Sequence, residues 1–474
     1  MNNLGMKLPP HLNRPRRILI DASFTLGSGK SSGVERVVRS VWKHAAEVAA
    51  SLQLPVPELV VSHGAEFYHA DQAVQQRYES VAAMHREVYT CLPRSYRPIA
   101  TQLCRTFPNQ TLRKWLLPDP GHLGAFKLAH MARERFMRGQ IARTATRITP
   151  GEDDLVLLPD AYWVNRLGQT IWPAAQAARE AGAKVVSFLY DLIPLSHPQF
   201  VGQERSRAFL DYMINLASNS DLVLAISKTV RDQAREFLTS LDAEMLGNVH
   251  TAADSPSEFC QDLRAFNLGC QINTEREGNV REEIRSIFAD QSPYLMVSTF
   301  DPRKNHDFLI DAFDRLWDAG GNQRLVLIGR LGARCANTIE RIRSHRMLGK
   351  QLFLLTDIGD GELQYAYENA RAVVFPSHVE GYGLPIVESL SFGKRTLASD
   401  TPIHREVGRN DCVYFDLSNP GSLAAAVNDC DRATEAGEAI PVISRELTSW
   451  KTSTEDVFDK CLSLYKTTAN SAAA

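Results

Sequence analysis

Residues 372–400 read AVVFPSHVEGYGLPIVESLSFGKRTLASD and decide how the second half of the chain is interpreted. The apolar run Ala372–Phe375 predicts a buried strand. A helix is expected to begin near Pro385, because proline is tolerated in the first turn of a helix. Gly381 and Gly383 lie between them and let the backbone approach a ligand, and the helix N-terminus favours an anion. The stretch therefore predicts a phosphate site between a strand and a helix.

Strands and helices alternate through most of the chain, as is typical of βαβ units and a parallel sheet. A helix is expected from Val34, where apolar residues recur with helical spacing. In the first half, the strands are expected at Arg17–Asp21, Leu155–Leu158, Lys184–Tyr190 and Asp221–Ile226. In the second half, they are expected at Tyr294–Ser298, Arg324–Ile328, Leu352–Leu355, Ala372–Phe375, Thr396–Ala398 and Val413–Phe415. The fold class is therefore α/β.

The length of 474 residues allows two large α/β domains. We expect the first domain in residues 1–245, with a basic insertion in 65–150, and the second in residues 292–443. Residues 246–291 have no clear periodicity and are predicted to be a linker region. Residues 444–474 should contain a helix that packs back on the first domain. Two doubly wound sheets joined in this way form a cleft at the carboxyl ends of their strands, where such sheets bind ligands.

The composition is that of a globular protein, with 53 Lys+Arg against 55 Asp+Glu and 44% hydrophobic residues. No apolar run is long enough to span a bilayer, and the N-terminus lacks the apolar stretch of a signal peptide. The 8 cysteines never lie close enough in sequence for a CxxC redox pair or a zinc knuckle. We therefore expect a cytoplasmic protein with free thiols.

One segment, residues 81–150, departs from this charge balance, because Lys and Arg far outnumber Asp and Glu in it. Trp115, Leu116 and Phe126 are interleaved with the basic side chains, a pattern suited to a membrane interface. We interpret the segment as docking on an anionic membrane surface, which would make the protein peripheral on the inner face of the cytoplasmic membrane. The alternative is a solvated basic face. Nucleic acid is not expected as a partner, because no recognition module accompanies the charge.

Glu380 and Glu388 are separated by seven residues in EGYGLPIVE. One lies before the predicted turn and the other lies about one turn into the helix, so both can line one groove. A carboxylate pair with this reach can hold hydroxyl groups of two parts of one ligand.

EGYGLPIVE, preceded by FPS and followed by GKRTLASD, resembles the donor-binding signature of family-4 retaining glycosyltransferases of the GT-B fold, the bacterial group-1 type. Further segments are similar to those of the same family in the same order: YDLIPLSHPQF at Tyr190–Phe200, LVLAISKTVRDQ at Leu222–Gln233, STFDPRKNHDFLIDAF at Ser298–Phe313 and LVLIGR at Leu325–Arg330. The resemblance implies an acceptor-binding first domain and a nucleotide-sugar donor-binding second domain, both Rossmann-like and facing each other across a cleft.

The resemblance also implies an activity: transfer of a hexose, of mannose or glucose type, from a nucleotide diphosphate sugar to an acceptor hydroxyl, with retention and without an obligatory metal or a cofactor. The acceptor is expected to be a saccharide or a lipid-linked saccharide in surface polysaccharide assembly. Glu380 would face the donor sugar, and Arg303 and Lys304 would neutralise the leaving diphosphate. Glu388 would bind the ribose of the nucleotide.

The remaining implied donor contacts are the backbone N–H groups of Gly381, Tyr382, Gly383 and Leu384, together with Gly33 at the start of the first helix. Thr299 stands where many members of the family carry another arginine, and we assign Arg330 to compensate for it. On the acceptor side we assign Asp191 and Tyr190, of which Tyr190 stands where relatives commonly have histidine.

Three alternatives remain open. FTLGSGKS at residues 24–31 differs from a P-loop only in its first position, so a P-loop kinase or NTPase is possible if a helix begins at its GKS triplet. Thr299 and Tyr190, in place of the expected residues, would also suit a catalytically degenerate nucleotide-sugar-binding subunit. A nucleotide-sugar epimerase or phosphorylase would use the same fold. The DxD triplet Asp429-Cys430-Asp431 lies in a predicted helix without a preceding buried strand, and we assign no metal to it.

Overall fold

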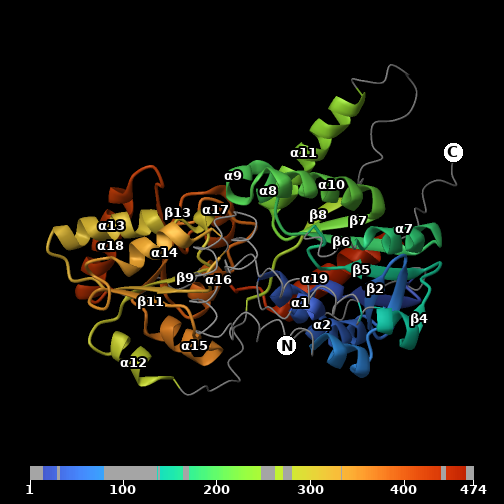
Figure 1. The fold of residues 1–474 in the computed structure, drawn as a ribbon, viewed down its shortest axis with the longest axis horizontal. Helices are drawn as coiled ribbons and strands as arrows, with labels where there is room; N and C mark the ends of the chain where they lie inside the picture. The colour runs from blue at the N-terminus through green and yellow to red at the C-terminus, as the bar shows by residue number, and fades with distance from the viewer. Residues whose placement is uncertain are drawn as a thin grey trace, which may run out of the picture.

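The computed structural model consists of two halves, each built around a sheet (Figure 1). It describes residues 14–28, 33–79, 136, 139–163, 170–246, 262–270, 280–332, 334–438 and 445–465. Aliphatic side chains make up most of the central strands of both sheets, because helices cover both faces of each sheet and bury these strands.

The first sheet has the strand order β4-β3-β2-β1-β5-β6-β7-β8. Its strands are β1 (Arg17–Asp21), β2 (Glu58–His63), β3 (Glu66–His69), β4 (Arg147–Ile148), β5 (Asp154–Leu158), β6 (Lys184–Leu189), β7 (Leu222–Ala225) and β8 (Leu263–Ala265). Neighbouring strands run parallel except for the pairs that β3 makes with β2 and β4. In the centre of the sheet, Leu19 of β1 pairs with Val156 of β5 and with Glu58 of β2.

Helices α2 (Gly33–Ser51) and α19 (Trp450–Leu462) pack on one face of this sheet, and α7 (Trp172–Glu180) and α10 (Gln203–Asn219) pack on the other. The apolar residues of α2 follow the predicted helical period, and most of them are buried. The structure also describes α1 (Ser23–Ser28), α8 (Ile193–Ser196), α9 (Pro198–Val201) and α11 (Lys228–Leu246) in this half.

The second sheet is entirely parallel and has the strand order β11-β10-β9-β12-β13-β14. Its strands are β9 (Tyr294–Val297), β10 (Leu325–Ile328), β11 (Leu352–Leu355), β12 (Ala372–Phe375), β13 (Arg395–Ser399) and β14 (Val413–Phe415). One face is covered by α13 (His306–Asp318), α14 (Ala336–Arg343) and α18 (Pro420–Glu435), and the other by α12 (Glu282–Ala289) and α15 (Asp360–Asn369). Helices α16 (Leu384–Ser391) and α17 (Pro402–Gly408) pack together beside β12 and β13.

The predicted α/β fold is confirmed, and each predicted strand lies within one or two residues of an observed one. Four strands were not predicted, β2, β3, β4 and β8. The first two form an antiparallel hairpin around Gly64, which has a positive φ of 62°. The other two contain 2 and 3 residues. Strands this short, at or near the sheet edge, carry too few apolar residues to give a periodic signal.

Residues 246–291 differ from the predicted linker, because β8 and α12 both lie within this range. β8 pairs with β7 and is the last strand of the first sheet, so that sheet extends beyond residue 245. At the C-terminus, α19 packs against α2 with Trp450, Val457 and Phe458 buried in the core of the first half. Most of the basic segment in 81–150 lies outside the described residues.

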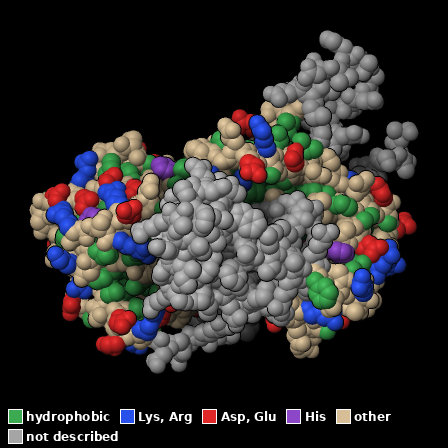
Figure 2. Space-filling model, viewed as in Figure 1, with side chains coloured by type: hydrophobic (Ala, Val, Ile, Leu, Met, Phe, Trp, Pro, Cys, Tyr) green, Lys and Arg blue, Asp and Glu red, His purple; other side chains and the backbone are tan. Residues whose placement is uncertain are grey.

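Charges are mixed on the surface that can be seen of the described residues, in keeping with the net charge of −2 (Figure 2). Among the helices that the structure describes, none is long and apolar enough to cross a membrane.

Candidate active site

Two neighbouring strands of the second sheet, β9 and β12, bring the predicted catalytic residues together at their carboxyl ends. After β9, Asp301 caps the short 3-10 turn Pro302–Lys304 by accepting a hydrogen bond from the Arg303 N–H at 3.2 Å. After β12, the N–H of His378 donates to the Arg303 carbonyl at 2.8 Å. The turn and the loop are therefore joined by their backbones, and Arg303 and Lys304 face Glu380.

Glu380 forms ion pairs with both cations. Arg303 Nη1 lies 2.6 Å from Glu380 Oε2, and Lys304 Nζ donates to Glu380 Oε1. Glu380 and Lys304 are 9% and 7% exposed. Burial lowers the pKa of Lys304 to about 8, although Glu380 opposes this. Burial also disfavours the ionised form of Glu380, but Arg303 and Lys304 outweigh it and bring the pKa of Glu380 to about 2.

Asp191 of the first half adds a second carboxylate to this group. It follows β6, and its Oδ1 accepts a hydrogen bond from the Ile193 N–H at 3.0 Å. Burial raises the pKa of Asp191, while the charge of Arg303 opposes the rise. Two carboxylates and two cations leave the group formally neutral when all four are ionised. An anionic ligand that takes the place of a carboxylate would therefore find both cations charged.

The loop that carries Glu380 touches the first half directly. A Cβ atom on Gly381 would lie 2.0 Å from the Tyr190 carbonyl oxygen, so only glycine fits there. Ser227 Oγ donates to the Gly381 carbonyl at 2.9 Å, and Tyr382 Oη donates to the Leu268 carbonyl at 3.2 Å. Gly383 is the N-cap of α16 with a φ of 100°, which favours glycine, and no side chain caps the helix there.

Glu388, one turn into α16, lies apart from Glu380 in a contact of its own. It is 4% exposed. Its Oε2 accepts a hydrogen bond from Tyr367 Oη at 2.9 Å, and its Oε1 pairs with Arg36 Nη1 from the first turn of α2. Gly33, the first residue of α2, faces Leu384, since a Cβ atom built on it would lie 3.8 Å from Leu384 Cδ1. The predicted donor residues Gly33, Leu384 and Glu388 are thus neighbours.

His404, in α17, is buried close enough to Glu380 and Lys304 to feel both charges. Its Nδ1 lies 3.0 Å from the Ser399 carbonyl oxygen, which can only accept, so Nδ1 carries the proton. Nε2 is therefore an acceptor, and it has no hydrogen-bond partner among the described residues. Burial lowers the pKa of His404, which keeps the ring neutral.

Tyr190 has surroundings that do not match the acceptor-side role assigned to it. The Tyr190 ring lies in the core of the first half, and its hydroxyl donates to the Pro159 carbonyl, so the side chain is not available to an acceptor. Arg330 follows β10 and is exposed, and among the described residues its guanidinium makes no hydrogen bond or ion pair.

Sequence reasoning missed Arg36 and Tyr367, the two partners of Glu388. No sequence signal could have found the first contact, because Arg36 and Glu388 are 352 positions apart and lie in different halves. Tyr367 gave no distinctive signal either, since an aromatic residue on a helix of a sheet protein is most often a core residue, and its ring does stack on Phe392.

The residues that the structure describes in the first half do not show the features of a P-loop. A helix, α1, covers residues 23–28, where a P-loop would place its open turn, and α2 begins at Gly33. The GKS triplet lies outside the described residues.

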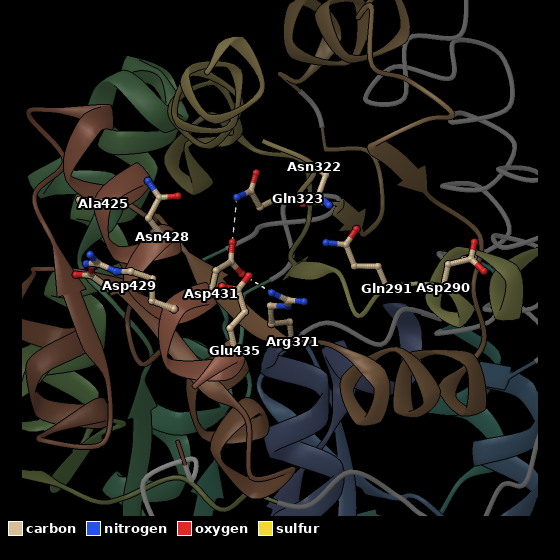
Figure 3. Close-up of a pocket in the computed structure, with 11 residues that line it drawn as sticks. Asp290, Gln291, Asn322, Gln323, Arg371, Ala425, Asn428, Asp429, Asp431 and Glu435 are labelled. Atoms are coloured by element: carbon tan, nitrogen blue, oxygen red, sulfur yellow. Dashed lines mark hydrogen bonds and ion pairs between the residues drawn. The ribbon is translucent and has the colours of Figure 1, made fainter. Parts of the chain in front are cut away.

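A polar pocket lies at the opposite end of the second sheet, where residues that precede β9, β10 and β12 approach α18 (Figure 3). Two of the carboxylates that line this pocket, Asp429 and Asp431, belong to the DxD triplet. Asp431 accepts hydrogen bonds from Arg371 at 2.5 Å and Gln323 at 3.0 Å, and Asp429 pairs with Arg432. In the part of the chain that the structure describes, no cluster of His, Cys, Asp and Glu could hold a metal ion. These acidic side chains are therefore held by arginines at a distance from Glu380.

Comparison with known proteins points to one group. Residues 281–432 match the family described as Glycosyl transferases group 1, which is about a third of the chain. The serotype-specific mannosyltransferase WbdA of Escherichia coli is 27% identical over 283 residues, 59% of this chain and 33% of that protein. The O-antigen chain mannosyltransferase RfbU of Salmonella typhimurium is 22% identical over 250 residues, 52% of this chain and 61% of that protein. The aligned part of the chain thus spans about a third of WbdA.

Solved structures share the whole fold. Anabaena HepE in complex with UDP-glucose aligns with a TM-score of 0.56 at 15% identity, covering 94% of this chain and 99% of that one. Sucrose-phosphate synthase from Thermosynechococcus elongatus aligns with a TM-score of 0.54 at 14% identity, covering 95% and 99%.

Proposed function

Since residues 281–432 belong to group 1 of the glycosyl transferases and the whole chain has the GT-B fold, we propose that the protein transfers a hexose from a nucleotide diphosphate sugar to an acceptor hydroxyl. One observation carries this proposal. The buried carboxylate of Glu380 is paired with two cations, Arg303 and Lys304, at the ends of two adjacent parallel strands. Open α/β sheets bind their ligands at this end.

The chemistry needs such a group. The bond between the anomeric carbon and a phosphate oxygen breaks, a bond to the acceptor oxygen forms, and the acceptor proton leaves with the products. Negative charge grows on the leaving diphosphate while the sugar gains oxocarbenium character. Arg303 and Lys304 would take up the phosphate charge, and Glu380, released from part of its pairing, would accept hydrogen bonds from the donor sugar.

The rest of the donor would extend along α16. Glu388 would accept hydrogen bonds from the ribose, and the uncapped N-terminus of α16, with the backbone N–H groups of residues 381–384, would face the diphosphate. Gly33 would allow the start of α2 to approach the phosphates. Arg330, exposed after β10, is proposed as a further phosphate contact in place of the arginine that Thr299 replaces.

We further propose that the transfer retains the anomeric configuration and needs neither a metal nor a cofactor. Two fixed cations against Glu380 supply the charge that a divalent ion would otherwise bring to the diphosphate. Asp191 is proposed to lie on the acceptor side, because it approaches this group from the first half.

The names of the relatives support mannose as the sugar and a surface polysaccharide as the product, since WbdA and RfbU are both described as mannosyltransferases and RfbU as one of the O-antigen chain. We propose a lipid-linked saccharide as the acceptor. The enzyme would then work at the inner face of the cytoplasmic membrane, with the basic segment in 81–150 as the surface that touches the lipid.

The test is direct. The purified protein is incubated with GDP-mannose, UDP-glucose and a dTDP-sugar, each with a lipid-linked saccharide acceptor. We expect nucleoside diphosphate release that depends on the acceptor, and NMR of the product should show the anomeric configuration of the donor. An inverted product would refute retention. A degenerate subunit would bind a donor without transferring or hydrolysing it, whereas an epimerase or phosphorylase would give a different product.

A further inference from the structure

The ion pair between Arg36 and Glu388 occupies the carboxylate that the proposed function assigns to the ribose. Glu388 is almost fully buried, and each of its oxygens has a partner, Tyr367 on Oε2 and Arg36 on Oε1. Tyr367 is buried within the same half as Glu388, whereas the Arg36 side chain is 38% exposed and comes from the other half. A ribose diol needs acceptor capacity on this carboxylate, and Arg36 is the partner that can move away to provide it.

Arg36 also lies where a displaced guanidinium would meet a diphosphate. It is on the first turn of α2, whose first residue, Gly33, contacts Leu384 at the start of α16. Two helix N-termini, one from each half, therefore approach each other next to Glu388, and both favour negative charge. The diphosphate that joins a ribose at Glu388 to a sugar at Glu380 must pass the start of α16.

We propose that Arg36 is a further donor-binding residue that exchanges partners: it holds Glu388 in the free protein, and it moves to the diphosphate when a ribose takes Glu388. This inference rests on the proposed function. Arginine suits the exchange, because its guanidinium binds a carboxylate and a phosphate with the same fork geometry. The exchange keeps Arg36 paired with an anion, while Glu388 accepts hydrogen bonds from ribose hydroxyls in place of the guanidinium.

The partner exchange predicts opposite effects on two ligands. Without Arg36, Glu388 is free for a ribose, so a bare nucleoside should bind more tightly. A nucleoside diphosphate should bind more weakly, because its phosphates lose a cation. We would measure binding of UDP, GDP and dTDP by titration calorimetry, choose the diphosphate that binds best, and compare it with its own nucleoside for the wild type and for Arg36→Ala.

We expect Arg36→Ala to bind the nucleoside about threefold more tightly and the diphosphate about tenfold more weakly, as the loss of one charged hydrogen bond implies. Arg36→Lys, which keeps the charge without the fork, should fall between the two proteins. Lys43→Ala removes the same charge from an exposed position on α2 and should change neither affinity.

Other results would overturn the exchange. Tighter binding of both ligands would mean that Arg36 only competes with the ribose for Glu388 and does not bind the diphosphate. Equal weakening of both, or no change in either, would make Arg36 a structural residue. Thermal unfolding of each variant shows whether a loss is one of folding, and Arg36→Lys then provides the comparison. The proposed function fails separately, if the wild type binds none of the diphosphates or if Glu388→Gln leaves nucleoside binding unchanged.

Discussion

The protonation state of Lys304 should set the upper pH limit of the reaction. Lys304 neutralises the leaving diphosphate only while it is charged. Its pKa of about 8, lowered by burial, means that a rise in pH removes the proton within the range where the protein can be assayed. We expect kcat/KM, which reports ionisations of the free enzyme, to fall as the pH rises through about 8. Arg303 should stay charged, because Glu380 and Asp191 raise its pKa against the effect of burial.

The size of the effect follows from the same environment. A lysine pKa of about 8 in place of 10.5 means that the buried site disfavours the ammonium by about 3 kcal/mol. A phosphate in contact with Lys304 would restore the stabilisation of its ammonium group. The alkaline limb of the pH profile, where the rate falls, should therefore lie at higher pH for kcat, which reports ionisations of the donor complex. Lys304→Ala should lower kcat by about a hundredfold to a thousandfold, as the loss of one electrostatic contact to a transition state does.

The assay is nucleoside diphosphate release from pH 6 to 10, the range in which the limb should fall, for the wild type, Lys304→Arg and Lys304→Ala. Lys304→Arg carries a charge that does not titrate in this range and should lose the limb near pH 8 while keeping part of the rate. If Lys304→Ala keeps the same alkaline limb, another group titrates. If its rate falls by less than about fivefold, Lys304 does not face the leaving group.

Other predictions test separate parts of the site. Glu388→Ala should raise the Kd of the nucleoside diphosphate with little change in kcat, whereas Glu380→Ala should mainly lower kcat, and equal, negligible effects would discard the site. Gly381→Ala should unfold at lower temperature because its Cβ meets the Tyr190 carbonyl, while Gly139→Ala, with nothing within 4 Å, should not. Activity should survive EDTA, and a rate that EDTA abolishes and Mg²⁺ restores would contradict the metal-free proposal. Vesicles with anionic lipid should co-sediment with the protein at low salt, less so after charge reversal at Arg113, Lys114, Arg133 and Arg135.

The sheets were predictable because their strands are short aliphatic runs between helical patterns. Val373 and Val374 are fully buried, and Val373 pairs with β9 on one side and β13 on the other, so the residues that predict the strand are those that build the core. β2 (ELVVSH) and β3 (EFYH) were missed because each has only two or three consecutive apolar residues, too few to give a periodic signal.

The candidate site was predictable where both partners lie in one sheet, and not where they come from two. Arg303 and Lys304 follow β9 and Glu380 follows β12, and parallel pairing brings such ends together. Arg36 reaches Glu388 only because the two halves meet, and no local pattern encodes that contact. Tyr190 was mispredicted for a different reason. Its place in a motif suggested a role in binding, but its side chain packs in the core of the first half.

The loop that carries Glu380 is held by the first half as well as by its own sheet. Ser227 donates to the Gly381 carbonyl, and directly after Ser227 the chain begins α11, whose first N–H groups, those of Lys228 and Thr229, both donate to Glu406 of α17 at 2.7 Å. A carboxylate at a helix N-terminus stabilises by up to about 2 kcal/mol when partly buried. Moving the halves apart would break this contact together with the one to Gly381. The position of Glu380 therefore depends on the first half as well as on its own sheet.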